Sequence, residues 1–155
     1  MSFQINALDP APFAHLFSLS DEDLGKANIS RMIVATKPGT PCRVSLADAE
    51  VGETVLLFNH LHQPANSPYR SCHAIFVRDG VKQAQPRIGD VPDVIRSRLI
   101  SVRLFDNQDM MVDADVVAGP AVAESLDRAF AKPDVAYVHL HYAKAGCFAA
   151  SVVRA

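Results

Sequence analysis

Short runs of apolar residues, many of them β-branched and some alternating with polar residues, recur along the chain and predict strands. The strand candidates span residues 3–8, 31–36, 53–60, 74–78, 100–105, 110–117, 135–142 and 147–153. Helical periodicity is clearest at 121–131, where apolar residues recur three and four positions apart. Shorter helices are predicted at 14–17, from Ser20 to about Ala27, and just after Pro92.

Strands outnumber helices, and several strands are joined by links too short for the crossover that parallel neighbours need. The pattern predicts an α+β fold, with a mostly antiparallel sheet and about three helices packed chiefly on one face. No repeat, linker or low-complexity segment interrupts the 155 residues. We therefore interpret residues 1–155 as a single domain.

The stretch VAYVHLHYAKAGCF (135–148) places two histidines one residue apart on a predicted strand. Successive strand residues point to opposite faces. Val138 and Leu140 therefore share one face, which we expect to be core, while His139 and His141 share the other. The same spacing suits imidazole ligands of a divalent metal, but it is also what a plain polar sheet face contains.

The register of this hairpin decides what else lies beside the histidines. Matching its two apolar faces requires a loop with an odd number of residues, in which Gly146 is the expected left-handed residue. Phe148 is then predicted on the core face and Cys147 on the histidine face.

An odd loop in the preceding hairpin, 100–117, would likewise put Arg103, Asp113 and Asp115 on the second face. If the two hairpins are neighbours, a carboxylate there would favour the charged form of His139, and burial would oppose it. That balance is what a general acid or base requires. His139 and Asp113 are thus the candidate catalytic residues and Arg103 a candidate ligand-binding residue. An ion pair between Arg103 and Asp113, purely structural, is the alternative.

Residues 60–73 are predicted to form an anion-binding loop that contains no acidic residue. Arg70 would supply a bidentate donor at its centre, and Tyr69, His62 and His73 would assist it. Arg43, in the turn-rich segment before the third strand, is a further ligand-binding candidate. An ordinary surface loop has a similar composition.

Charge and composition exclude several classes of protein. Fifteen Lys and Arg against 17 Asp and Glu give a net charge of -2, so the chain has no overall field to hold nucleic acid. Its apolar runs are too short to cross a membrane, and the N-terminus lacks the features of a signal peptide. We expect a cytoplasmic protein; the oligomeric state is left open.

Three cysteines, Cys42, Cys72 and Cys147, lie in different segments and form no C-x-x-C pair. The sequence therefore predicts no tightly held structural zinc, no metal ligands and no cofactor. Cys42 beside Arg43 and Cys147 near His141 are the thiols whose setting is most electropositive.

Three stretches carry a resemblance to a known family: PGTPCRVSLADAEVGETVLLFNHLHQPANSPYRSCHAIFVRDG, DMMVDADVVAG and VAYVHLHYAKAGCFAASVVRA. Together they resemble a bacterial family of uncharacterised proteins, a domain of unknown function of about this size. The resemblance implies a single-domain bacterial protein and brings no activity or catalytic residues. Some relatives look like C-x-x-C where this chain has Cys42-Arg43-Val44-Ser45, so a zinc knuckle is not carried over.

Three functions remain open on the sequence. The first is binding of a small polar or anionic ligand on the polar sheet face, with residues 37–43 and 60–73 at its rim. The second is a hydrolase or metal-dependent enzyme that uses Asp113, His139 and His141. The third is a protein-interaction module, which would favour an apolar open face, whereas this face carries Arg103 and two histidines.

Overall fold

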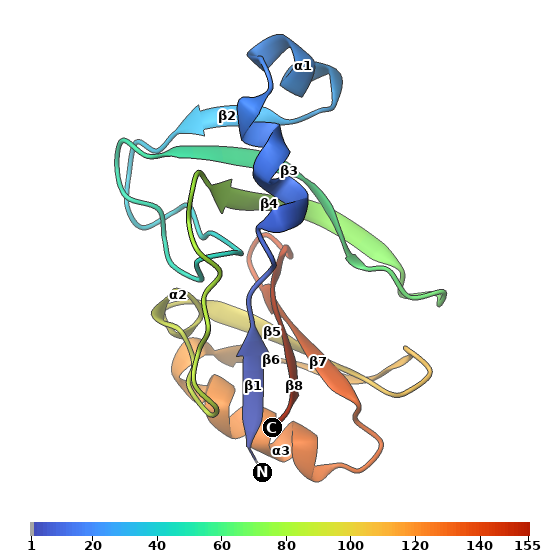
Figure 1. Cartoon of the computed structure of the whole chain (residues 1–155). Helices are drawn as coiled ribbons and strands as arrows, with labels where there is room; N and C mark the ends of the chain where they lie inside the picture. Colours follow the sequence, from blue (N-terminus) through green and yellow to red (C-terminus); the bar gives the residue numbers. More distant parts are fainter. Residues whose placement is uncertain (1) are drawn as a thin grey trace.

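The computed structural model describes residues 2–155, in which eight strands form two antiparallel sheets (Figure 1). The larger sheet has the order β1-β8-β7-β5-β6 and the smaller the order β2-β3-β4. The larger comprises β1 (Phe3–Asn6), β5 (Leu99–Phe105), β6 (Met111–Ala118), β7 (Tyr137–Tyr142) and β8 (Phe148–Arg154). The smaller comprises β2 (Ser30–Ile33), β3 (Thr54–Gln63) and β4 (Ser71–Arg78). The predicted α+β, mostly antiparallel architecture is confirmed, although the strands divide between two sheets.

Helices pack against both sheets. They are α1 (Asp21–Lys26), α2 (Asp93–Arg96), α3 (Val122–Ala131) and the 3₁₀ helices η1 (Ala11–Ser18) and η2 (Gly119–Ala121). α3 packs against the larger sheet, and η1 and α1 pack against the face of the smaller sheet that carries Phe58 and His60 (Figure 1). α1 begins as predicted, because the Ser20 hydroxyl accepts a hydrogen bond from the Asp23 amide at 3.1 Å. Within residues 2–155, no helix combines the length and the apolar character that crossing a bilayer requires.

Two large hydrophobic cores follow from this arrangement, beside a small cluster around Val55. The amphipathic helix α3 buries Val122, Leu126 and Phe130 against the five-stranded sheet, on the face away from β2, β3 and β4 (Figure 1). The second core lies where η1 and α1 meet the smaller sheet, around Phe13 and Leu24. Each such side chain stabilises the fold by about 1.5–3 kcal/mol through burial. The remaining face of the larger sheet meets β3, and that junction contains the histidines.

The β5–β6 hairpin begins in the predicted register and then leaves it. Phe105 pairs with Met111, as an odd loop requires, but Leu104 pairs with Asp113 because a bulge intervenes. From this bulge onward Asp113 and Asp115 lie on the α3 side of the sheet, so their predicted face is wrong. Placing two carboxylates on this face costs little folding free energy, because β6 is an edge strand and both carboxylates remain exposed.

The β7–β8 hairpin departs from the predicted register next to its loop and returns to it further along the strands. His141 pairs with Phe148, which places Phe148 on the histidine face rather than in the predicted core. A bulge then restores the expected register, so that Leu140 pairs with Ala150 and Val138 with Val152. Gly146 has φ +82°, as predicted for the loop. Cys147 lies against Arg43 instead of joining the histidines, because its Sγ accepts from that guanidinium at 3.1 Å.

Candidate functional site: a cluster of three buried histidines

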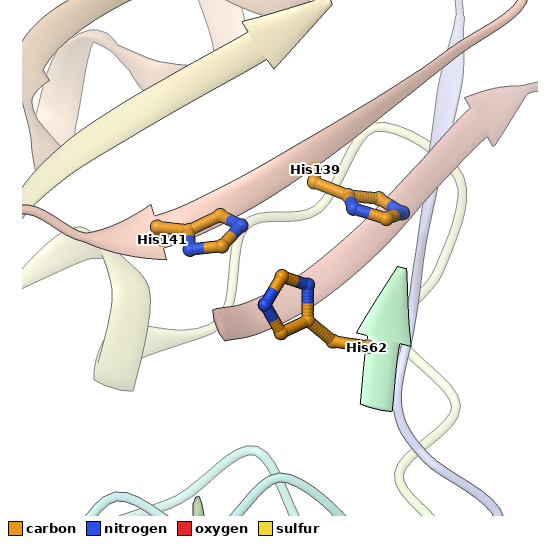
Figure 2. A group of neighbouring side chains, drawn as sticks. All are labelled: His62, His139 and His141. Carbon is orange, nitrogen blue, oxygen red and sulfur yellow. The ribbon is translucent and has the colours of Figure 1, made fainter. Parts of the chain in front are cut away.

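Three histidines from two different sheets meet at the junction of the sheets. His139 and His141 are alternate residues of β7 and point away from Val138 and Leu140, as the sequence predicts. His62 comes from β3, just before Gln63, where the β3–β4 register shifts. It lies in a strand rather than in the loop predicted at 60–73, and it points across to β7 (Figure 2). The exposed face expected for β7 is in fact covered.

The rings are close enough for their nitrogens to act together (Figure 2). One nitrogen of each histidine lies within 4.8 Å of a nitrogen of the other two. The ring centroids of His62 and His141 are 4.9 Å apart, and those of His62 and His139 are 6.2 Å apart. All three side chains are buried, with His141 only 1% exposed.

Aromatic side chains enclose the cluster and fix its rings. The Phe148 ring stacks on His62 at 5.2 Å and meets the edges of His139 and His141. Phe105 and Tyr137 pack against His139 at centroid distances of 5.2 and 5.3 Å. Strand alternation in the sequence already puts Tyr137 on the histidine face, but the sequence does not predict that Phe105 and Phe148 join it. The bulge that moves Phe148 to this face is not visible in the sequence pattern.

Burial keeps the three imidazoles neutral. It lowers the pKa of His62 and of His139 to about 4, and neighbouring positive groups add to the effect. Burial also lowers the pKa of His141, to about 3, although a hydrogen bond with Gly146 opposes the shift. At neutral pH each ring therefore retains one nitrogen with a free lone pair.

Hydrogen bonding selects which nitrogen is free in His141. Its Nδ1 lies 2.9 Å from the Gly146 carbonyl oxygen, and a carbonyl can only accept. Nδ1 therefore carries the proton, and Nε2 is left unprotonated. In His62 the Nδ1 atom is buried without a hydrogen-bond partner among residues 2–155. An unpartnered polar atom of this kind costs about 1–3 kcal/mol unless a ligand satisfies it.

Arg103 lies beside the cluster on the same sheet face, because it pairs with His139 across β5 and β7. Its Nε donates to the Ser101 hydroxyl at 3.2 Å, and no carboxylate of residues 2–155 pairs with it. Its positive charge contributes to the lowered pKa of all three histidines. The predicted proximity of Arg103 and His139 is confirmed.

Asp113 does not join them. Its carboxylate lies on the other face and accepts from Lys132 Nζ at 2.6 Å, a contact that lowers the pKa of the exposed Asp113. The predicted carboxylate partner of His139 is thus replaced by two imidazoles. The cause is the bulge beyond Phe105, which shifts the β6 register by one residue.

The other predicted ligand-binding residues lie outside the histidine cluster, although Arg43 and His73 line one cavity. Arg70 is exposed and donates to the Pro64 carbonyl within its own loop. Tyr69 packs against Phe105 at 6.1 Å, behind His139. His73 lies in β4 opposite His60. Arg43 is buried at 1% exposure and donates to the Phe148 carbonyl at 2.7 Å.

Comparison with known families places the chain without naming a reaction. Residues 39–154 match the family described as "Protein of unknown function (DUF1203)". The chain belongs to this family. No curated protein and no solved structure matches it. The resemblance to an uncharacterised family is confirmed, and all three clustered histidines of this DUF1203 protein lie within the matched residues.

Proposed function

We propose that this DUF1203 protein holds a divalent transition-metal ion between His62, His139 and His141. The observation that carries the proposal is the convergence of three ring nitrogens within 4.8 Å of one another. Zinc–nitrogen bonds of about 2.0–2.1 Å place the nitrogens of a tetrahedral site about 3.3 Å apart. Small rotations of the rings supply that contraction.

The state of the ligands supports the same reading. A metal binds neutral imidazole, and burial already keeps these rings neutral, so no proton has to be displaced at neutral pH. The bond from His141 to the Gly146 carbonyl orients the ring as outer hydrogen bonds of metal-binding histidines do. Three imidazoles without a carboxylate suit zinc, copper, nickel or iron better than magnesium or calcium.

Three protein ligands leave one coordination position for water or for a small ligand. A dipositive ion beside Arg103 would carry positive charge that no carboxylate of the cluster neutralises. A small anion, or hydroxide derived from bound water, is the complementary occupant. Both functions suggested by the sequence, binding of an anionic ligand and metal-dependent hydrolysis, would therefore use this open coordination position.

The proposal departs from the sequence-based expectation of no metal ligands. That expectation rested on cysteine spacing and on the fact that the His139–His141 spacing is also what a plain polar sheet face contains. The three free cysteines still fit the cytoplasmic location suggested by the sequence.

The test is a titration of the chelator-treated protein with Co²⁺ followed by visible absorption, which reports coordination geometry directly. We expect one Co²⁺ per chain with the intense d–d bands of a four-coordinate site, displaced by one equivalent of Zn²⁺. His139→Leu, which keeps the apolar packing, should weaken binding at least about 100-fold. His15→Ala is the matched control, because His15 is exposed on η1 and outside the cluster.

Two outcomes would overturn the proposal. One is octahedral, weakly absorbing Co²⁺ that His15→Ala removes and His139→Leu does not. The other is no binding by a wild-type protein whose circular dichroism and thermal transition show that it is folded.

A further inference from the structure

A second site lies between the β7–β8 loop, the segment 39–43 and the residues that follow α2. It is a cavity of about 490 Å³, within the range of small-molecule sites. Leu57, Ala74, Phe76, Leu99 and Ala145 contribute its apolar lining. Arg43, Arg98, Tyr142, Lys144, Cys147 and His73 contribute its polar lining, and no lining residue is acidic.

The Tyr142 hydroxyl is the first observation that points to a ligand. Tyr142 is only 6% exposed, and its hydroxyl oxygen has no hydrogen-bond partner among residues 2–155. Buried hydroxyls are nearly always paired in proteins. A phenolic hydroxyl is protonated at neutral pH and can donate a hydrogen bond.

Arg43 is the second, independent observation. Its guanidinium is 1% exposed and donates to the carbonyls of Phe148 and Pro41 and to Cys147 Sγ, all of them uncharged oxygens or sulfur. No carboxylate of residues 2–155 forms an ion pair with it. A buried cation without a counter-ion is costly, and an anion in the adjoining cavity would offset that cost.

The side chains around the cavity carry more positive than negative charge. The Tyr142 ring lies between two guanidiniums, with Arg43 at 5.0 Å and Arg98 at 5.4 Å from its centroid. Asp48 neutralises Arg98 through two contacts of 2.6 and 3.0 Å, but it leaves Arg43 unpaired. The exposed ammonium of Lys144 adds a further charge at the rim.

We infer that this cavity binds a small monocarboxylate with an apolar body. The Tyr142 hydroxyl lies just beneath the lining, and a slight rotation of its ring lets it donate to the carboxylate beside Arg43. The apolar lining removes the aliphatic or aromatic body from water. Neither the three histidines nor a metal takes part, so the inference is independent of the proposed metal site.

Cys147 allows the inference to be tested, because it lines the cavity and is partly exposed. In a Cys72→Ser background the exposed thiol is gone and Cys42 is buried, so iodoacetamide reports on Cys147. We expect saturating octanoate to slow alkylation of Cys147 at least about tenfold, and octan-1-ol to slow it less than about twofold. EDTA is present throughout, so that carboxylate bound to a metal cannot contribute.

Two variants sharpen the test. Tyr142→Phe removes only a hydroxyl that has no partner, so the chain should fold normally, and octanoate should bind about tenfold more weakly. Lys144→Gln should weaken octanoate by about two- to threefold, as expected of an exposed charge. Lys82→Gln is a control charge change away from the lining residues.

Equal protection by octanoate and octan-1-ol would show that the cavity binds the apolar body without recognising the carboxylate, and the inference would be wrong. Octanoate affinity unchanged by Tyr142→Phe would remove the hydroxyl from the site. Absence of protection by octanoate would also overturn it.

Discussion

The two buried polar sites lie back to back, and they differ in what burial does to charge. His141 and Tyr142 are consecutive residues that point to opposite sides of β7, one into the histidine cluster and one into the cavity. Each site holds one of the two buried side-chain atoms without a partner within residues 2–155, His62 Nδ1 and the Tyr142 hydroxyl. In each site, a bound ligand could supply the missing partner of a buried polar atom.

Burial removes the charge of histidine but not that of arginine. The imidazoles become neutral lone-pair donors, whose complement is a cation. An arginine side chain is a cation, and the complement of the Arg43 guanidinium is therefore an anion. Two sites on opposite sides of β7 are thus expected to select ligands of opposite charge.

The largest expected effect comes from removing the cation of the cavity. Arg43→Met keeps much of the side-chain volume but leaves the carbonyls of Phe148 and Pro41 without a donor. Each hydrogen bond to a charged group is worth about 1.5–3 kcal/mol, and relief of the buried charge offsets part of the loss. We expect a decrease of about 3 kcal/mol in the free energy of unfolding, measured by urea denaturation. A variant as stable as wild type would show that the guanidinium contributes nothing net to folding.

The histidine cluster should respond to a cation by nearly as much. Zn²⁺ at about 100 times its dissociation constant should stabilise the protein by about 2.7 kcal/mol, because the unfolded chain lacks the converged ligands. For a chain of this size that corresponds to about 5–10 °C in melting temperature. His139→Leu should show no zinc-dependent shift. An equal shift in this variant would place the binding elsewhere.

The Asp48–Arg98 ion pair should make a smaller contribution to the free energy of unfolding, and one that depends on pH. Burial raises the pKa of Asp48, but hydrogen bonds from Arg98 and the Gly39 amide outweigh it, so the pKa lies below its ordinary value. A lowered pKa in the folded state gives stability that is present above the ordinary value of 3.8 and lost as pH falls through the folded value.

Asp48→Asn should therefore cost about 2 kcal/mol at pH 7 and flatten the loss of stability below about pH 4. Since it also frees the charge of Arg98, it should tighten octanoate binding in the cavity. Urea denaturation between pH 3 and pH 7 measures the first effect, and protection of Cys147 measures the second. Unchanged acid sensitivity would show that this pair does not control the slope.

The sequence predicted the elements of this fold well, because their local signals agree with their tertiary roles. Alternation placed Val138 and Leu140 in the core and the histidines opposite, and Gly146 was identified as the left-handed loop residue. These features depend on residues close together in the chain. Local backbone preference and periodicity are sufficient to fix them.

The site depended on information that periodicity does not carry. One bulge turned Asp113 away from the histidines, and another turned Phe148 toward them. A bulge moves the residues on one side of it to the other sheet face, and the pattern of apolar and polar residues does not show where it lies. The contact of His62 with His139 and His141 also joins residues more than 70 positions apart in the sequence. An estimate of which strands pack across sheets would have been needed to find it.

The smallest expected effects distinguish a ligand-binding group from a structural one. Tyr142→Phe removes an unpartnered buried hydroxyl, so the free energy of unfolding should stay within about 0.5 kcal/mol of wild type or rise slightly. Arg70→Ala should be equally mild, since the exposed Arg70 bonds only within its own loop. Urea denaturation of both variants is the measurement. A loss above about 1 kcal/mol in Tyr142→Phe would mean that the hydroxyl already has a partner, such as buried water, and would weaken the case that a carboxylate is what it lacks.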